Sequence, residues 1–143
     1  MVFVAHGTSK QKLEDILERN YLHRGMFVWD ASTLEEDYPR DQAEELSRRK
    51  ATEYAWRWAT FKYGLQNAAV LTFEVDSGLL VKGSLSANEK MLTKDLALYR
   101  DVVGFDFQRD MPADIYVKIS RDIQGTLAPI VSRRPVRSYW RQR

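Results

Sequence analysis

Cysteine is absent from this chain of 143 residues. Its absence excludes disulfide bonds, thiolate nucleophiles and zinc sites built on sulfur. Histidine is scarce as well, since the chain has only His6 and His23, which lie on different segments without the spacing of metal ligands. The sequence therefore predicts no metal site.

Long apolar runs are also missing. No stretch approaches the roughly 20 consecutive apolar residues that a helix needs to cross a bilayer. The apolar opening, residues 1–5, is too short for the core of a signal peptide. We therefore expect a soluble protein without a membrane partner, located in the cytoplasm or delivered into a host cytoplasm.

The sequence has no internal repeat, no low-complexity stretch and no Gly/Ser-rich linker. With 44% hydrophobic and 12% aromatic residues, it can bury one core of ordinary size but has little room for a second. We therefore predict one domain over residues 1–131 and a separate tail over residues 132–143.

This tail is basic and aromatic, although the net charge of the whole chain is only +2. It contains Tyr139 and Trp140 and no acid. Its arginines include Arg133, Arg134, Arg137 and Arg141. One interpretation is a solvated tail whose aromatic side chains pack back on the domain. The alternative is a strip that contacts the phosphates and bases of nucleic acid.

Local patterns predict an α+β fold in which strands and helices alternate irregularly. Apolar or alternating segments predict strands at residues 2–5, 25–29, 68–75 and 114–119. Helical spacing of apolar residues predicts one helix from Thr8 or Ser9 to about Asn20 and a longer one from about Asp41 to Tyr63. A mixed helical pattern covers residues 88–103.

His6, Gly7 and Thr8 join a predicted strand to a predicted helix, a place where ligands meet free backbone donors. Gly7 lets a ligand approach the main chain, Thr8 offers a hydroxyl, and His6 offers a neutral donor or acceptor near pH 7. The same three residues also fit a histidine that simply caps the sheet. The motif by itself leaves both interpretations open.

Two further side chains are candidates for a site. Tyr54 lies on or beside the buried face of the longest predicted helix, where it either packs in the core or stacks on a flat ring such as nicotinamide. Asp114 opens the last predicted strand. Its carboxylate either marks the start of that strand or accepts hydrogen bonds from ribose hydroxyls and stabilises positive charge on a sugar. Glu74 and Asp76 are rival acids that we rank below Asp114.

Taken in this order, the segments resemble the ADP-ribosyltransferase superfamily, particularly its poly(ADP-ribose) polymerase-like and diphtheria-toxin-like branch. The likeness runs from Phe3 to about Ile119. It rests on His6-Gly7-Thr8, the aromatic segment 25–29, the stretch 51–55 around Tyr54, the hydrophobic segment 70–75 and the segment 114–117 that begins with an acid. None of these pieces is specific alone, and their order carries the resemblance.

The resemblance implies an ADP-ribosyltransferase-like split β-sheet with flanking helices and a site for NAD as co-substrate. In that site, His6 forms a hydrogen bond with a ribose hydroxyl, and the backbone of Gly7 holds the nicotinamide carboxamide. Thr8 is the third residue of this NAD-binding motif. Tyr54 stacks on the nicotinamide ring, and Phe27 or Trp29 stands where the family carries a tyrosine. Asp114 takes the place of the catalytic glutamate.

The expected function is mono-ADP-ribosyl transfer, in which the chain cleaves NAD, releases nicotinamide and transfers ADP-ribose to a protein or nucleic-acid acceptor. The short chain favours a single transfer over polymer synthesis and permits a toxin or effector role. Two alternatives stay open. One is a non-catalytic module that binds NAD, ADP-ribose or nucleic-acid ends, and the other is a structural interaction domain in which His6 and Tyr54 are core residues.

Overall fold

The computed structural model describes residues 1–83 and 86–131, with side chains as far as Asp122. Its contacts divide the chain into two compact units, of which the first covers Met1–Arg109 and the second begins at Asp110. The basic tail, residues 132–143, lies outside the described residues, so the expected boundary after residue 131 stays a prediction.

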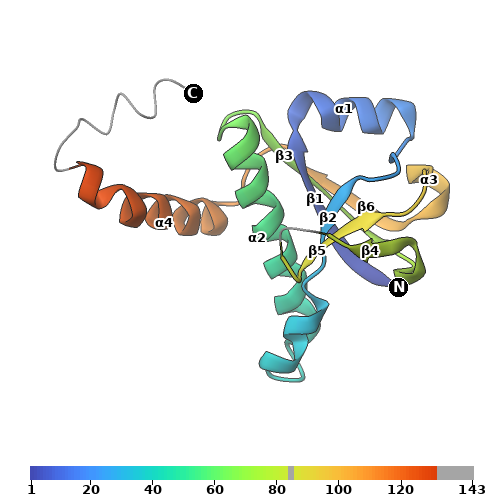
Figure 1. Cartoon of the computed structure of the whole chain (residues 1–143), viewed down its shortest axis with the longest axis horizontal. Helices are drawn as coiled ribbons and strands as arrows, with labels where there is room; N and C mark the ends of the chain where they lie inside the picture. Colours follow the sequence, from blue (N-terminus) through green and yellow to red (C-terminus); the bar gives the residue numbers. More distant parts are fainter. Residues whose placement is uncertain (84–85, 132–143) are drawn as a thin grey trace. The chain divides into compact units, whose positions relative to one another are not determined.

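The first unit contains a six-stranded sheet, as Figure 1 shows. The strands are β1 (Val2–Ser9), β2 (Phe27–Trp29), β3 (Ala68–Val75), β4 (Leu80–Lys82), β5 (Glu89–Leu92) and β6 (Val103–Gln108). The helices are α1 (Lys10–Arg19), α2 (Ala43–Tyr63) and the single-turn α3 (Leu98–Asp101), with two 3-10 turns, η1 (Ser32–Asp37) and η2 (Ser77–Leu79). The second unit contains helix α4 (Ala113–Val131).

The strand order is β4-β5-β2-β1-β3-β6, and every neighbouring pair is antiparallel. An antiparallel sheet with flanking helices confirms the predicted α+β class. β1 pairs with β3 along its whole length. Because successive residues of a strand point to opposite faces, Val4, His6 and Thr8 lie on one face of β1, and Ala5 and Gly7 lie on the other.

Helix α1 covers the face that carries Val4. Ser9 caps its start by accepting a hydrogen bond of 3.1 Å from the Lys12 amide, and Asn20 ends it in the left-handed conformation. Leu13 and Ile16 of α1 are buried in the main hydrophobic cluster of the first unit. The other members of that cluster include Val4, Val28, Leu71, Phe73, Val75, Leu92 and Leu98.

Helix α2 covers the opposite face of β1 and β3 (Figure 1). Ala51, Ala55 and Ala59 form a buried row on α2 at a spacing of four residues. A methyl group in place of the Gly7 hydrogen would lie 2.2 Å from the Ala55 carbonyl oxygen. The backbone of β1 is therefore in direct contact with the backbone of α2.

The sequence predicts α2 and its C-terminal cap at Gly64 correctly. Tyr54, which the sequence places on or beside the buried face, is half-buried beside the alanine row, as are Lys50 and Trp58.

Residues 114–119 do not form the predicted strand, because they lie in helix α4. Ile115 and Ile119 are four residues apart, which places both on one side of a helix, and both are buried, whereas Val117 is exposed. Ile115 and Ile119 thus fit both the alternation of a strand and the four-residue spacing of a helix. Asp114 consequently lies in the first turn of a helix and not at the start of a strand.

The mixed helical pattern over residues 88–103 is also misleading. That segment forms β5, the short α3 and the start of β6. β5 pairs with β2 and β4, and β6 pairs with β3. Pairing with distant strands decides the structure here, and local spacing does not contain that information.

We predict that Gly7→Ala lowers the free energy of unfolding by about 1–3 kcal/mol, because the added methyl group must displace the α2 backbone. Gly78→Ala is the control, since its new methyl group would lie 3.4 Å from the Asp76 carboxylate, an ordinary contact. Its stability should change by less than about 1 kcal/mol. Urea unfolding followed by tryptophan fluorescence measures both, and a Gly7→Ala protein as stable as wild type would contradict the contact.

Candidate functional site

His6 lies near the end of β1, and its imidazole reaches toward β2. The Nδ1 atom lies 2.6 Å from the carbonyl oxygen of Phe27. Because a carbonyl oxygen can only accept, Nδ1 carries the proton and donates it, which leaves a lone pair on Nε2. His6 therefore offers a hydrogen-bond acceptor that suits a hydroxyl group.

The His6 imidazole is neutral at physiological pH. Burial lowers its pKa from 6.5 to about 4 and outweighs the hydrogen bond to Phe27, which raises the pKa. The positive charges of His23, Lys12 and Lys62 lower it further. Lys12 and Lys62 also make the surroundings of His6 favourable for an anionic group.

The sheet opens between β1 and β2 beside His6. β1 pairs with β2 at one position, Ala5↔Trp29, whereas it pairs with β3 throughout. Beyond that position, the hydrogen bond from the His6 side chain connects β1 to Phe27. Helix α1 begins at Lys10, four residues after His6, and has no acid in its first turn, so no side-chain charge offsets the positive end of its dipole.

Trp29 and Tyr54 form an aromatic pair beside the opening. Trp29 lies on β2 and Tyr54 on α2, with ring centroids 5.4 Å apart and ring planes at 45°. The Lys50 ammonium lies 5.5 Å from the centre of the Tyr54 ring. Phe27 and Trp29 are two residues apart, about 7 Å along an extended strand. The aromatic pair and the His6 imidazole therefore flank the same short stretch of β2.

The other residues of the predicted motif are less open. Gly7 faces α2, and the close packing of that helix accounts for the glycine without a ligand. Thr8 is only 2% exposed. Phe27 is 44% exposed and is thus the most accessible of the predicted aromatic residues on β2.

The acids that the sequence singles out lie on three different elements. Asp114 belongs to helix α4 of the second unit. Glu74 lies on the α2 face of β3 and accepts a hydrogen bond of 3.1 Å from Arg48. Asp76 accepts the amide hydrogen of Gly78 and caps η2. Glu74 and Asp76 therefore have structural partners of their own.

Glu89 is a carboxylate that sequence reasoning misses. It opens β5 and pairs with Trp29, so both side chains leave the sheet on the face that α2 covers. It is 2% exposed, and a methyl group at Gly83 would lie 2.4 Å from its Oε1, so the carboxylate packs against the main chain. No local pattern marks this residue, since its position depends on the pairing of β5 with distant strands.

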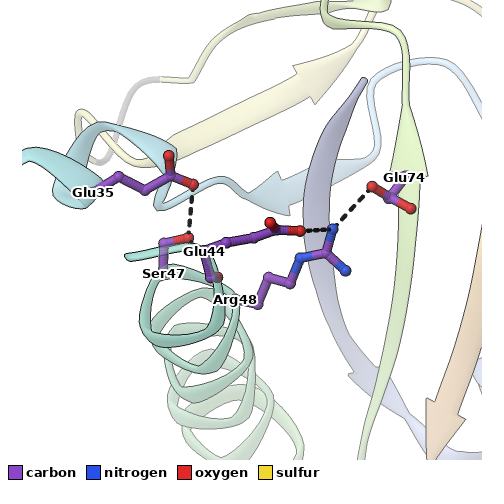
Figure 2. A network of polar contacts seen from close by, with 5 residues as sticks. All are labelled: Glu35, Glu44, Ser47, Arg48 and Glu74. Atoms are coloured by element: carbon purple, nitrogen blue, oxygen red, sulfur yellow. Dashed lines mark hydrogen bonds and ion pairs between the residues drawn. The ribbon is translucent and has the colours of Figure 1, made fainter. Parts of the chain in front are cut away.

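A polar pocket of about 310 Å³ lies at the start of α2. Residues from β1, η1, α2 and β3 line it, among them Phe3, Glu35, Glu44, Ser47, Arg48 and Glu74. Figure 2 shows the Arg48 guanidinium between Glu44 and Glu74, at 2.8 and 3.1 Å. The same guanidinium lies 5.0 Å from the centre of the Phe3 ring.

This network acts as a structural clamp. Arg48 joins α2 to β3 through Glu74, and the Ser47 hydroxyl joins α2 to η1 through a bond of 3.1 Å to Glu35 (Figure 2). The polar groups that line the pocket thus bond to one another. We assign them to fixing the start of α2 on the sheet.

Among the side chains described, those of residues 1–83 and 86–122, His, Asp and Glu form no group of three or more that could hold a metal ion. In the same part of the chain, no helix combines the length and apolar character needed to span a bilayer.

Comparison with known proteins adds little to these observations. No protein-family model matches the sequence, and no curated protein matches it. Among solved structures, the chain is similar to the X-ray crystal structure of protein CC0527 from Caulobacter crescentus, with 13% identity and a TM-score of 0.42 over 78% of this chain and 90% of that chain. A likeness of this size does not identify a family for the chain.

The clamp at the start of α2 predicts a modest loss of stability in Arg48→Met. The change leaves Glu44 and Glu74 without their shared cation, and because both pairs are partly exposed we expect a loss of about 1 kcal/mol. Arg40→Met, at an exposed position, is the matched control and should be neutral. Equal urea midpoints for the two variants would show that the network does not clamp the helix.

The lowered pKa of His6 predicts that stability depends on pH. The unfolded imidazole gains its proton near pH 6.5 and the folded one near pH 4, so stability is lost as the pH falls through this window. We expect an NMR titration midpoint near 4 for His6 and a smaller loss of stability between pH 6.5 and 4 in His6→Gln. If the stability of the wild type and that of His6→Gln depend on pH in the same way, His6 is not the cause of the loss of stability.

Proposed function

We propose that the first unit binds NAD at the opening between β1 and β2 and catalyses mono-ADP-ribosyl transfer, on a split sheet of the ADP-ribosyltransferase type. The observation that carries this proposal is the state of His6. Its imidazole is neutral and is fixed by Phe27 with the Nε2 lone pair available. A ribose hydroxyl is a donor that suits this acceptor.

The surroundings of His6 support a dinucleotide as the ligand. Lys12 and Lys62, together with the N-terminus of α1, provide positive potential for a diphosphate group. Trp29 and Tyr54 provide aromatic surface for a nicotinamide or adenine ring. His6 lies on one face of the sheet and the aromatic pair on the other, so a dinucleotide that contacts both must pass between β1 and β2 where the two strands separate.

Glu89 is the carboxylate of the first unit that we propose as catalytic, and Asp114 stays the candidate that the sequence offers. Glu89 lies beside Trp29 on the face covered by α2. When the bond between ribose C1′ and nicotinamide breaks, the electron pair leaves with neutral nicotinamide and positive charge grows on the sugar. A fixed carboxylate stabilises that charge. The acceptor atom then bonds to C1′ and releases its proton to the carboxylate or to water.

A second candidate function is binding of NAD or ADP-ribose without reaction. The burial of Glu89 against Gly83 favours it, because a carboxylate in that position has little contact with solvent. The two candidates share the His6 site and differ in whether the glycosidic bond is broken.

Release of nicotinamide from NAD, followed by chromatography with cell lysate as the source of acceptor, tests the proposal. We predict release by the wild type, a loss of about 100-fold in Glu89→Gln through lost charge stabilisation, and about tenfold in His6→Ala through a lost hydrogen bond. Glu18→Gln, an exposed acid on α1, is the control and should be fully active.

Calorimetric titration with NAD separates the remaining outcomes. Binding without release would favour the non-catalytic module. Neither binding nor release at about 1 mM NAD, near the upper end of ordinary Michaelis constants, would overturn both functions.

A further inference from the structure

One aromatic side chain on the second half of α2 lies open to water, and two others near it are half-buried. Phe61 is 78% exposed, and its ring centroid lies 5.9 Å from that of Trp58 with the planes 37° apart. The two residues are three apart, so both lie on one side of the helix. An exposed ring that packs on a half-buried neighbour forms a contiguous aromatic patch, which indicates an interaction site more strongly than a single exposed apolar residue does.

Lysine side chains accompany these rings. The Lys62 ammonium lies 5.9 Å from the centre of the Trp58 ring and 5.5 Å from that of Tyr63. Lys12 of α1 approaches Tyr63 as well, at 5.2 Å from the ring centre and 3.1 Å from the hydroxyl oxygen. Residues 54–63 contain no Asp or Glu. These five side chains, Lys12, Trp58, Phe61, Lys62 and Tyr63, form what we call the aromatic–lysine surface.

We propose that the aromatic–lysine surface binds single-stranded nucleic acid. Unpaired bases present flat faces that stack on exposed aromatic rings, and the phosphates between them attract ammonium groups. A duplex keeps its base faces stacked inside the helix and can make only the second of these interactions. The surface therefore prefers single strands over duplexes.

The charge of the surface distinguishes this partner from a protein. Because residues 54–63 of α2 contain no Asp or Glu, the lysines of this surface repel those of a second copy of the chain. An apolar protein partner would remove water from the ammonium groups and offer them no hydrogen-bond acceptor in its place. A strand that alternates flat bases with phosphates satisfies the rings and the lysines together.

The surface also lies close to the proposed NAD site. Lys12 and Lys62 both act electrostatically on His6, so a strand bound to these lysines passes near the opening between β1 and β2. The assignment of that strand as the acceptor of ADP-ribose rests on the proposed function. Binding of the strand does not, and it is expected with or without NAD.

Fluorescence anisotropy of a labelled oligo-dT of about 12 nucleotides, with the full chain at low salt and no NAD, tests the binding. We expect Phe61→Ala and Phe61→Leu to weaken binding at least about fivefold, since neither side chain stacks on a base. Lys62→Gln should weaken binding and reduce the salt dependence by about 0.7 in the logarithmic slope, which corresponds to one phosphate contact. A duplex of equal length should bind more weakly to the wild type.

Tyr21→Ala and Lys82→Gln are the matched controls, because they remove an exposed aromatic residue and an exposed lysine elsewhere on the first unit. Their affinities should equal that of the wild type. The proposal is overturned if no oligonucleotide binds at low salt, or if both Phe61 variants, with wild-type urea stability, bind as tightly as the wild type. Since no NAD is present, neither result depends on nicotinamide release.

Discussion

The direct contact between the backbone of β1 at Gly7 and the backbone of α2 at Ala55 determines where the rest of α2 lies. No side chain separates the two, and the neighbouring alanines, Ala51 and Ala59, keep the helix equally close along the strand. A side chain at Gly7 would push α2 outward, and close-packed interiors tolerate such shifts poorly. Gly7, which belongs to the predicted NAD-binding motif, is thus required for the packing of α2 on β1, whether or not it also contacts a ligand.

With its position set by this contact, α2 has a different role along each third of its length. Its start is clamped to β3 through Arg48, its middle brings Tyr54 against Trp29, and its last turns leave Phe61 open to water. His6 adjoins Gly7 on the same strand, and its hydrogen bond to Phe27 holds β2 where the two strands separate. Packing, the neutral histidine and the aromatic groups therefore depend on a single helix–strand contact.

The elements that local chemistry specifies were predictable. Ser9 and Gly64 mark a helix start and a helix end by capping, and β3 is a buried apolar run. The segment around Ile115 and Ile119 was not, because its residues fit a strand period and a helical period equally well. For the proposed site, the sequence offers His6 and Tyr54, whose roles stay proposals. Glu89 reaches the face covered by α2 through the pairing of β5 with distant strands, which no local pattern encodes.

We propose that the neutral His6 imidazole accepts a hydrogen bond from NAD, and NMR of the chain with isotope-labelled histidines detects such a bond. As NAD is added to about 1 mM, we predict a saturable shift of the His6 Nε2 resonance, larger than that of His23, while Nδ1 keeps its proton toward Phe27. An unchanged His6 spectrum, or equal changes at both histidines, would contradict the account.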